Sequence, residues 1–222
     1  MSVERVAIIG GTGEEGFGLA SRWTRAGIEV VIGSRERGRA AEAVERLRAL
    51  VPGARASGLE NTAAAAAAPV VVVTVPFAGQ AATYRSIRDH VGEETIVIDC
   101  TAPLAAATGG RASQLLGVWQ GSAAQQAAAL LERGTLCAAF HSLSASLLAE
   151  SERQLEGDVL VCGAQAGKGA VRELVEAIPK LRFVDAGPLD GARIVESMTA
   201  LLIGINRRYK THAGIRITGL PS

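Results

Sequence analysis

A glycine-rich loop near the N-terminus carries the first spacing with a clear chemical use. Gly11, Gly13 and Gly16 stand in G-x-G-x-x-G register. In a dinucleotide site such glycines allow a tight turn, close approach of a pyrophosphate and close packing of a helix on a strand. The helix that follows directs its N–H groups and positive dipole end at the phosphates. The loop therefore predicts dinucleotide binding, with these candidate contacts: Gly11, Thr12, Gly13, Glu14, Glu15 and Gly16.

Glu14 and Glu15 are the unusual residues of this loop. Carboxylates in the first turn of a helix are favoured by its dipole, yet these two lie where phosphates are expected. Two interpretations stay open. Either the side chains point to solvent, or they weaken nucleotide binding.

Ser34 and Arg35 follow the second apolar segment, where an NAD site usually has Asp or Glu to accept from the ribose 2′-OH. A carboxylate would repel a 2′-phosphate, whereas a hydroxyl and a guanidinium would bind one. Arg39 lies one helical turn further on, and Thr12 can donate its hydroxyl from the loop. We therefore predict NADP as the nucleotide. The alternative is that Arg35 and Arg39 are solvated charges at the start of a helix.

The apolar pattern indicates the elements that would position these residues. Continuous apolar runs predict buried strands at 5–9, 28–32, 70–75, 95–99 and 136–140. Helices are expected at 17–26, 40–51, 63–68 with Asn61 and Thr62 as caps, 78–90, and 123–131 with Ser122 as cap. This alternation predicts a doubly wound parallel sheet. Residues 101–121 have no clear period and are expected to form a long loop facing the ligand.

The C-terminal third continues with predicted strands at 159–162 and 182–184 and helices at 169–178 and 192–208. We expect an α/β fold with two domains. Residues 1–143 would form a Rossmann-type nucleotide-binding domain, and residues 144–222 a smaller C-terminal α/β domain.

Composition excludes several classes of protein. With 222 residues, 48% hydrophobic and 20% charged, the chain is typical of a globular protein. A net charge of +1 and 4% aromatic residues favour neither nucleic-acid nor membrane binding. No apolar run reaches the roughly 20 residues of a membrane span, and no signal peptide is evident. Cys100, Cys137 and Cys162 are widely spaced, which indicates reduced structural thiols without metal spacing. We expect a cytoplasmic protein that uses no metal.

Five segments in order resemble the NADPH:coenzyme F420 oxidoreductase family: GGTGEEG, GSR, VTVP, AFHSLSA and DAGPLDGARIVESMTALL. The resemblance covers nearly the whole chain and is most specific between Asp185 and Glu196. It implies a Rossmann domain, a small C-terminal domain, a cleft between them and a homodimer. It also implies that NADP lies on the glycine loop, with its 2′-phosphate at Thr12, Ser34, Arg35 and Arg39.

The resemblance further implies where the deazaflavin cofactor F420 and the nicotinamide meet. Thr74, Val75, Pro76 and Phe77 would line the nicotinamide half of NADP. The deazaflavin would be held by His141, Ser142, Leu143, Ser144, Ala145 and the backbone near Ala213. Hydride would pass directly between the two rings, so no residue is assigned a certain catalytic role. His141 is the one candidate, to hydrogen-bond the deazaflavin or stabilise charge, and the alternative is a histidine satisfied at a strand end.

Two departures from the family pattern bear on the acceptor. Archaeal members have Thr-Ile-Pro-Ala where this chain has Ser142-Leu143-Ser144-Ala145. Family members also more often have neutral residues at the positions of Glu14 and Glu15. Either departure could signal altered affinity or a different hydride acceptor. The alternatives are a reductase of an imine, a carbonyl or a ferric chelate, and a regulatory protein that senses NADP without turnover. Ser142 and Ser144 could donate to the coenzyme or cap the next helix.

The last predicted helix suggests two further features. Arg207, Arg208 and Lys210 form the densest basic cluster and could attract the anionic tail of the deazaflavin. The alternative is that they complement the C-terminus of the helix. The apolar run 198–203 could supply the face of a homodimer.

Overall fold

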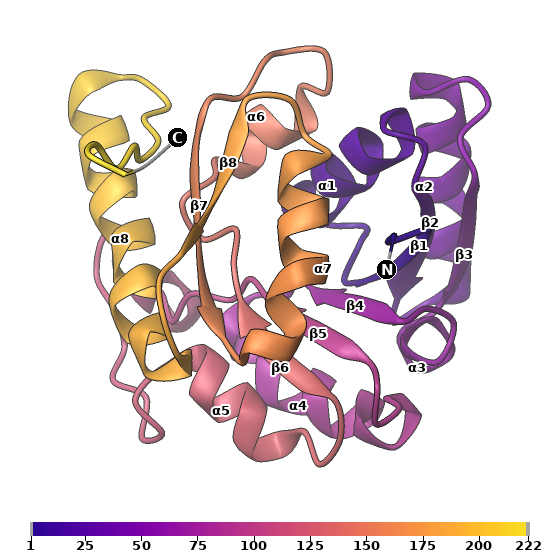
Figure 1. The fold of residues 1–222 in the computed structure, drawn as a ribbon, viewed down its shortest axis with the longest axis horizontal. Helices are drawn as coiled ribbons and strands as arrows, with labels where there is room; N and C mark the ends of the chain where they lie inside the picture. The colour runs from indigo at the N-terminus through magenta and orange to yellow at the C-terminus, as the bar shows by residue number, and fades with distance from the viewer. Residues whose placement is uncertain (1, 221–222) are drawn as a thin grey trace.

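The computed structural model describes residues 2–220 as eight strands in one sheet, flanked by helices (Figure 1). The strand order is β3-β2-β1-β4-β5-β6-β7-β8. The strands are β1 (Arg5–Ile9), β2 (Glu29–Ser34), β3 (Ala56–Glu60), β4 (Val70–Val73), β5 (Ile96–Asp99), β6 (Thr135–Ala138), β7 (Gly157–Gly163) and β8 (Leu181–Asp185). All neighbouring pairs are parallel except β6 with β7. The prediction of a doubly wound, mostly parallel α/β sheet is confirmed.

Helices cover both faces of the sheet. One face carries α1 (Glu14–Arg25), α2 (Arg37–Leu50), α6 (Ala145–Ala149) and α7 (Gln165–Glu176). The other carries α3 (Asn61–Ala65), α4 (Phe77–Ile87), α5 (Ala123–Leu130) and α8 (Ala192–Tyr209). Short 3₁₀ turns lie at Arg88–His90, Ala105–Thr108 and Leu189–Gly191.

The strands are buried on both sides, which explains their continuous apolar runs. In β1, Val6 and Ile8 belong to the core under α1, α2 and α7, whereas Ala7 and Ile9 belong to the core on the opposite face. All four side chains are fully buried. The central strands therefore form a rigid platform, and their carboxyl ends present the loops.

The connection from β6 to β7 explains the one antiparallel pair. Residues 139–156, including α6, stay at the carboxyl end of β6, so β7 runs back along it with Ala138 opposite Cys162. β8 then pairs in parallel with β7. The division into residues 1–143 and 144–222 stays a prediction.

Several local predictions were wrong. Helix α1 begins at Glu14 instead of residue 17. Its first turn therefore contains Glu14 and Glu15, whose carboxylates are favoured there by the helix dipole. Strand β3 was missed, since ASGLE is a half-exposed edge strand without apolar alternation. Asn61 does not cap α3: the helix already includes it, and its Oδ1 accepts from the backbone N–H of Gly10 at 3.4 Å. In contrast, Ser122 caps α5 as predicted, accepting from the Gln125 N–H at 3.0 Å.

None of the helices between residues 2 and 220 is both long and apolar enough to cross a membrane. Cys100, Cys137 and Cys162 are free and buried. Burial raises the pKa of each thiol, which fits their interpretation as structural residues.

Candidate cofactor-binding site

The glycine loop connects the end of β1 to the start of α1 and brings backbone donors to the carboxyl edge of the sheet. A Cβ at Gly16 would lie 2.5 Å from the Thr74 Oγ1 and 2.8 Å from the Gly11 Cα, so only glycine lets α1 pack this closely. Gly13 is the N-cap of α1, and no described side chain accepts from the first turn. The first N–H groups of α1 are therefore available to an anion, which is the arrangement a phosphate requires.

The predicted 2′-phosphate residues lie on the β2 side of this loop. Ser34 ends β2, is buried, and its Oγ accepts from the Glu36 N–H at 3.3 Å. Arg35 and Arg39 are exposed. Because α2 begins at Arg37, Arg35 precedes the helix, and the expected one-turn spacing between the two arginines was wrong. Their role in binding stays a prediction.

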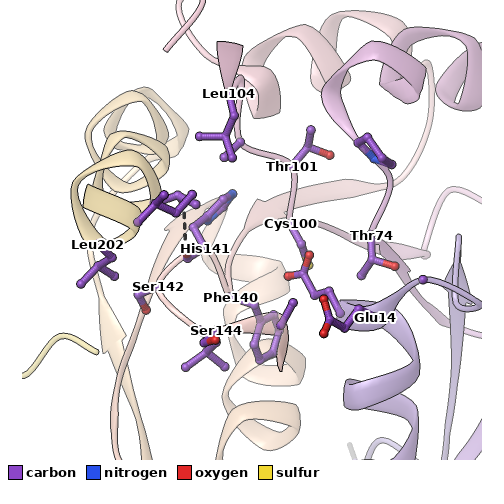
Figure 2. Close-up of a pocket in the computed structure, with 18 of the residues that line it drawn as sticks. Glu14, Thr74, Cys100, Thr101, Leu104, Phe140, His141, Ser142, Ser144 and Leu202 are labelled. Carbon is purple, nitrogen blue, oxygen red and sulfur yellow. Dashed lines mark hydrogen bonds between the residues drawn. The ribbon is translucent and has the colours of Figure 1, made fainter. Parts of the chain in front are cut away.

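A cavity of about 510 Å³ opens on the other side of the loop, beside the ends of β4, β5 and β6 (Figure 2). It brings together the predicted nicotinamide and deazaflavin residues with part of the loop. The predicted residues that line it are Gly13, Glu14, Glu15, Thr74, Val75, Pro76, Phe77, His141, Ser142, Leu143, Ser144, Ala145 and Ala213. The predicted residues outside it are Gly11, Thr12, Gly16, Ser34, Arg35 and Arg39. One group thus surrounds the cavity, and the other follows the loop toward β2.

The cavity also contains residues that the sequence analysis did not name as cofactor contacts. Those after β5 and β6 are Cys100, Thr101, Ala102, Leu104, Phe140 and Ser146, and those on α8 are Thr199, Leu202, Ile203 and Asn206. The first set had a signal, since segments that follow parallel strands face the ligand. In the α8 set, Thr199, Leu202 and Ile203 belong to the run 198–203, for which we expected a dimer face, and the apolar spacing did not indicate that they would line a cavity.

His141 is a buried polar residue in the wall of this cavity. The residue is 4% exposed, its two ring nitrogens are buried without a hydrogen-bond partner of good geometry among the described residues, and the Thr101 backbone lies close enough to raise its pKa slightly. Burial lowers the pKa of His141 to about 4, so the ring is neutral at pH 7. Its carbonyl accepts from the Thr199 Oγ1 at 2.9 Å, which ties it to α8 (Figure 2). Unpartnered buried nitrogens are costly, and a ligand that supplies a partner would relieve that cost.

A buried acidic group underlies the same cavity. The Asp99 Oδ2, at the end of β5, accepts from the Gln80 Nε2 at 3.0 Å and the Tyr84 hydroxyl at 2.8 Å. Its Oδ1 accepts from the Thr101 N–H at 3.0 Å. Burial raises the pKa of Asp99 to about 6 in spite of these hydrogen bonds. Burial and the nearby Asp99 carboxylate raise the pKa of Glu15 to about 8.

The two glutamates of the loop therefore differ. Glu14 is exposed, whereas Glu15 is partly buried beside Asp99 and Cys100. The interpretation that both point to solvent was wrong for Glu15. Its position over β5 brings a carboxyl group into the cavity, and sequence spacing gave no sign of this.

The segment after β6 forms one wall of the cavity. Phe140 has a positive φ of 72°, a strained conformation for a bulky residue. Its ring packs edge-on against the Trp23 ring, with the two ring centroids 5.8 Å apart. The Ser142 Oγ donates to the Asp158 carbonyl at 3.0 Å. Ser144 is the N-cap residue of α6, but its hydroxyl contacts Ser146 at 2.9 Å and the His212 Nδ1 at 3.2 Å instead of the helix backbone. Neither serine acts as a side-chain helix cap.

The segment that follows α8 forms another side of the cavity. Ala213 lines the cavity, and its N–H donates to the Asn206 Oδ1 at 2.6 Å. Arg207, Arg208 and Lys210 are exposed at the end of α8 and do not line the cavity. Their attraction for an anionic tail stays a prediction.

Comparison with known proteins gives consistent results. Residues 5–103 match the family described as NADP oxidoreductase, coenzyme F420-dependent. The chain is 43% identical over 225 residues to the F420-dependent NADP reductase of Methanothermobacter thermautotrophicus, covering 99% of this chain and 97% of the relative. It is 38% identical over 223 residues to the protein of the same name from Methanothermobacter marburgensis, covering 98% and 99%.

A solved structure shares the fold over the full length. A protein of Arthrobacter sp. FB24, described as a candidate F420-dependent NADP reductase, superimposes with a TM-score of 0.81 at 21% sequence identity. The match covers 98% of this chain and 100% of that one.

Proposed function

Because the chain belongs to the family of coenzyme F420-dependent NADP oxidoreductases, we propose that it transfers a hydride directly between NADP(H) and coenzyme F420. The observation that carries this proposal is identity of 35–43% over 97–99% of the chain to proteins named F420-dependent NADP reductase. The cavity supports it, since its volume of about 510 Å³ can hold two rings and a buried histidine lies in its wall.

The residues of the loop fit a nicotinamide nucleotide. The uncapped N-terminus of α1 would bind the pyrophosphate, and Gly16 keeps α1 close enough to β4 for this. Ser34 and Arg35 would select NADP over NAD by binding the 2′-phosphate. The nicotinamide half would then extend over β4 toward Thr74 and the cavity.

The residues of the cavity orient a second ring against the first. His141 is neutral and can donate from one nitrogen and accept at the other, so it would position the deazaflavin without adding charge. The segment 142–145 and α8 would exclude water from the rings. The cofactors supply the hydride chemistry, and the protein contributes orientation, which can account for about 7–11 kcal/mol of a barrier.

One assay tests this proposal. The purified chain is mixed with NADPH and oxidised F420, and the absorbance of both is followed. We expect both to be consumed in equal amounts. Turnover only with an imine, a carbonyl or a ferric chelate would indicate a reductase of that acceptor, and NADPH binding without turnover of any acceptor would indicate a regulatory protein. Either result would contradict the proposal.

We also propose a homodimer that uses the outer face of α8. Ile194 and Leu201 lie two turns apart on this helix and are 60% and 61% exposed, and Trp119 is 98% exposed. Large apolar side chains this exposed are typical of an interface. Sedimentation velocity checks the proposal: we expect a dimer, and Leu201→Glu should shift it toward monomer. A monomeric wild-type chain would contradict it.

We propose two further features of the chain. The chain would be divided at residues 143 and 144 into a nucleotide-binding part and a part that closes the cavity. It would act in the cytoplasm, which agrees with three free, buried cysteines.

A further inference from the structure

Glu15 occupies a particular place along the expected path of the nucleotide. Since β1 lies between β2 and β4, the glycine loop separates the β2 end, with Ser34 and Arg35, from the cavity over β4 and β5. A dinucleotide with its 2′-phosphate at β2 must place its nicotinamide on the cavity side. Glu15, the second residue of α1, lines that cavity beside Asp99 and Cys100.

The surroundings of Glu15 contain acids and no base. Asp99 at the end of β5 and Cys100 just after it lie near Glu15, and Glu14 precedes it on α1. The Tyr84 hydroxyl of α4 donates to Asp99. His141, on the segment after β6, is neutral. No lysine or arginine is found among the described residues that line the cavity. The charge of Glu15 is therefore compensated by no cation of the protein, which agrees with its raised pKa of about 8.

We propose that the charge of Glu15 follows the redox state of the bound nicotinamide: Glu15 is ionised beside NADP⁺ and protonated beside NADPH. This inference rests on the proposed function, because it requires a nicotinamide in the cavity. Glu15 thereby becomes a residue that determines the relative affinity for the two forms of the nucleotide.

The physical cause is the charge of the nicotinamide ring. The ring carries one positive charge in NADP⁺ and none in NADPH, and the rest of the molecule is the same. A carboxylate in a partly buried, cation-free cavity is stabilised by the cationic ring, whereas the neutral ring displaces water from it and disfavours its charge. NADP⁺ should therefore bind with proton release, and NADPH with proton uptake.

Equilibrium binding at two pH values measures this linkage without any hydride acceptor. The dissociation constants of NADPH and NADP⁺ are determined by titration calorimetry at pH 7 and pH 9, where the 2′-phosphate, with a pKa of about 6, stays ionised. With a pKa of about 8 for Glu15, the NADPH constant should rise about tenfold over this range and the NADP⁺ constant should fall about tenfold, so their ratio should rise about a hundredfold. Calorimetry at pH 8 in buffers of different ionisation enthalpy should show uptake of about 0.5 proton with NADPH.

Three variants make the test specific. Glu15→Gln keeps the shape of the side chain and removes its titration, so the ratio should become independent of pH. Glu15→Met should behave in the same way, which separates loss of charge from loss of a hydrogen bond. Glu14→Gln removes a charge from the exposed neighbouring residue and should retain the pH dependence. Circular dichroism checks that each variant is folded.

The outcomes separate this inference from the proposed function. A pH-independent ratio in the wild-type chain, or an unchanged pH dependence in Glu15→Gln, would overturn the role of Glu15 while leaving NADPH:F420 exchange intact. If the wild-type chain bound neither nucleotide, both proposals would fail together.

Discussion

At the scale of single residues, Arg35 is the strongest candidate for choosing between NADP and NAD. It follows the last residue of β2 and is exposed, so a 2′-phosphate can reach it without displacing a protein partner. A hydrogen bond to a charged group contributes about 1.5–3 kcal/mol. NADH lacks the 2′-phosphate. Arg35→Ala should therefore reduce the preference for NADPH over NADH by about tenfold or more.

The preference is measured as the ratio of kcat/KM values for NADPH and NADH. Arg48→Ala is the matched control, because Arg48 is likewise an exposed arginine but lies at the far end of α2, where it pairs with Glu45. It should leave the preference unchanged. A preference that survives Arg35→Ala would remove Arg35 from the 2′-phosphate site.

The sequence predicted the types of residue at the site better than their surroundings. The glycine register, the strand end at Ser34 and the segment at His141 are local patterns, and a local pattern is visible in one sequence. The burial of Glu15 depends on Asp99 and Cys100, which stand more than 80 positions further along the chain. Such neighbours follow from the sheet order, and spacing alone does not give them.

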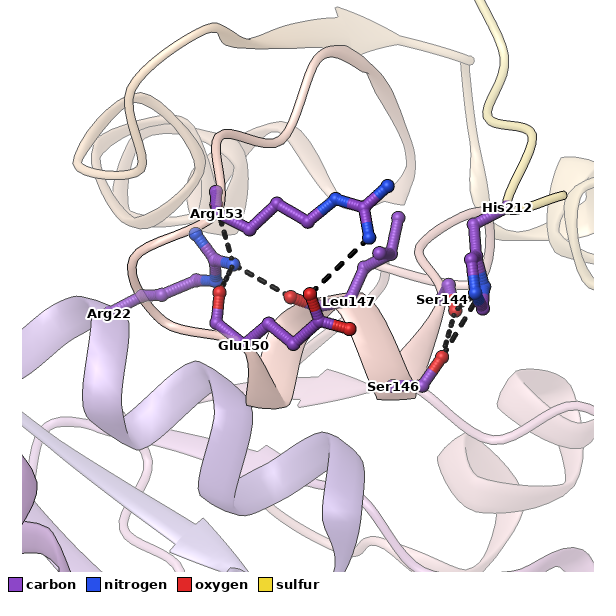
Figure 3. A network of polar contacts seen from close by, with 7 residues as sticks. All are labelled: Arg22, Ser144, Ser146, Leu147, Glu150, Arg153 and His212. Carbon is purple, nitrogen blue, oxygen red and sulfur yellow. Dashed lines mark hydrogen bonds and ion pairs between the residues drawn. The ribbon is translucent and has the colours of Figure 1, made fainter.

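At the scale of elements, α1 and α6 form a unit held by one buried arginine. The Arg22 guanidinium donates to the carbonyls of Leu147 at 2.7 Å, Glu150 at 2.9 Å and Arg153 at 3.0 Å (Figure 3). It also donates to the Leu148 carbonyl at 3.1 Å. These include the unpaired carbonyls at the end of a short helix. Gly18 allows the contact, since a Cβ there would lie 2.6 Å from the Leu148 Cβ. Helix α1 thus positions the segment around α6 that forms one wall of the cavity.

Arg22→Ala should loosen this wall. Loss of hydrogen bonds from a charged donor to buried carbonyls should lower the free energy of unfolding by about 1.5–3 kcal/mol. Urea unfolding measures this change, and hydrogen exchange should become faster in residues 140–153. Arg25→Ala is the control, because Arg25 is on the same helix but makes exposed contacts with Ser151 and Glu152, and its loss should cost less than about 1 kcal/mol. Equal losses in the two variants would contradict a positioning role for Arg22.

Element prediction failed where tertiary contacts replace local signals. Strand β3 is short, half-exposed and contains Gly58, whose Cβ would lie 2.7 Å from the Ala40 backbone of α2. Helix α6 has five residues and depends on Arg22 for its last carbonyls. Neither has a period long enough to detect. The buried strands were predicted because burial on both faces produces a continuous run of apolar residues. Helix α8 was predicted because its amphipathic pattern extends over many residues.

At the scale of the whole molecule, three acidic side chains in or near the site have raised pKa values because they are buried. Burial raises the pKa of Glu196 to about 7, although its carboxylate accepts from the Ala123 N–H at 2.8 Å and the Ala124 N–H at 2.9 Å. Glu15 and Asp99 are shifted in the same direction. A folded state with raised acid pKa values binds more protons than the unfolded chain. Its stability therefore falls as pH rises toward the folded-state pKa.

His141 has the opposite effect in a different pH range. Its folded-state pKa of about 4 lies below the usual 6.5, so its contribution to stability is present above pH 6.5 and is lost below it. The lowered pKa values of Asp158 and Asp185 act only at still lower pH, near and below their usual 3.8. From pH 6.5 to about 8 the buried carboxylic acids determine the slope, and the buried thiols, whose pKa values are raised from 9.0, add to it in the same direction at higher pH.

We therefore expect the ligand-free protein to lose stability between pH 6.5 and pH 8.5. For Glu15, a shift from 4.5 to about 8 implies a loss of up to about 2 kcal/mol over this range. Urea unfolding at the two pH values measures the slope. Glu15→Gln should flatten it, because the amide does not titrate, and the remaining slope should come from Glu196 near pH 7. Stability that is constant or rises over this range would show that the Glu15 carboxyl group is hydrated, and the linkage to the nicotinamide would then lose its physical basis.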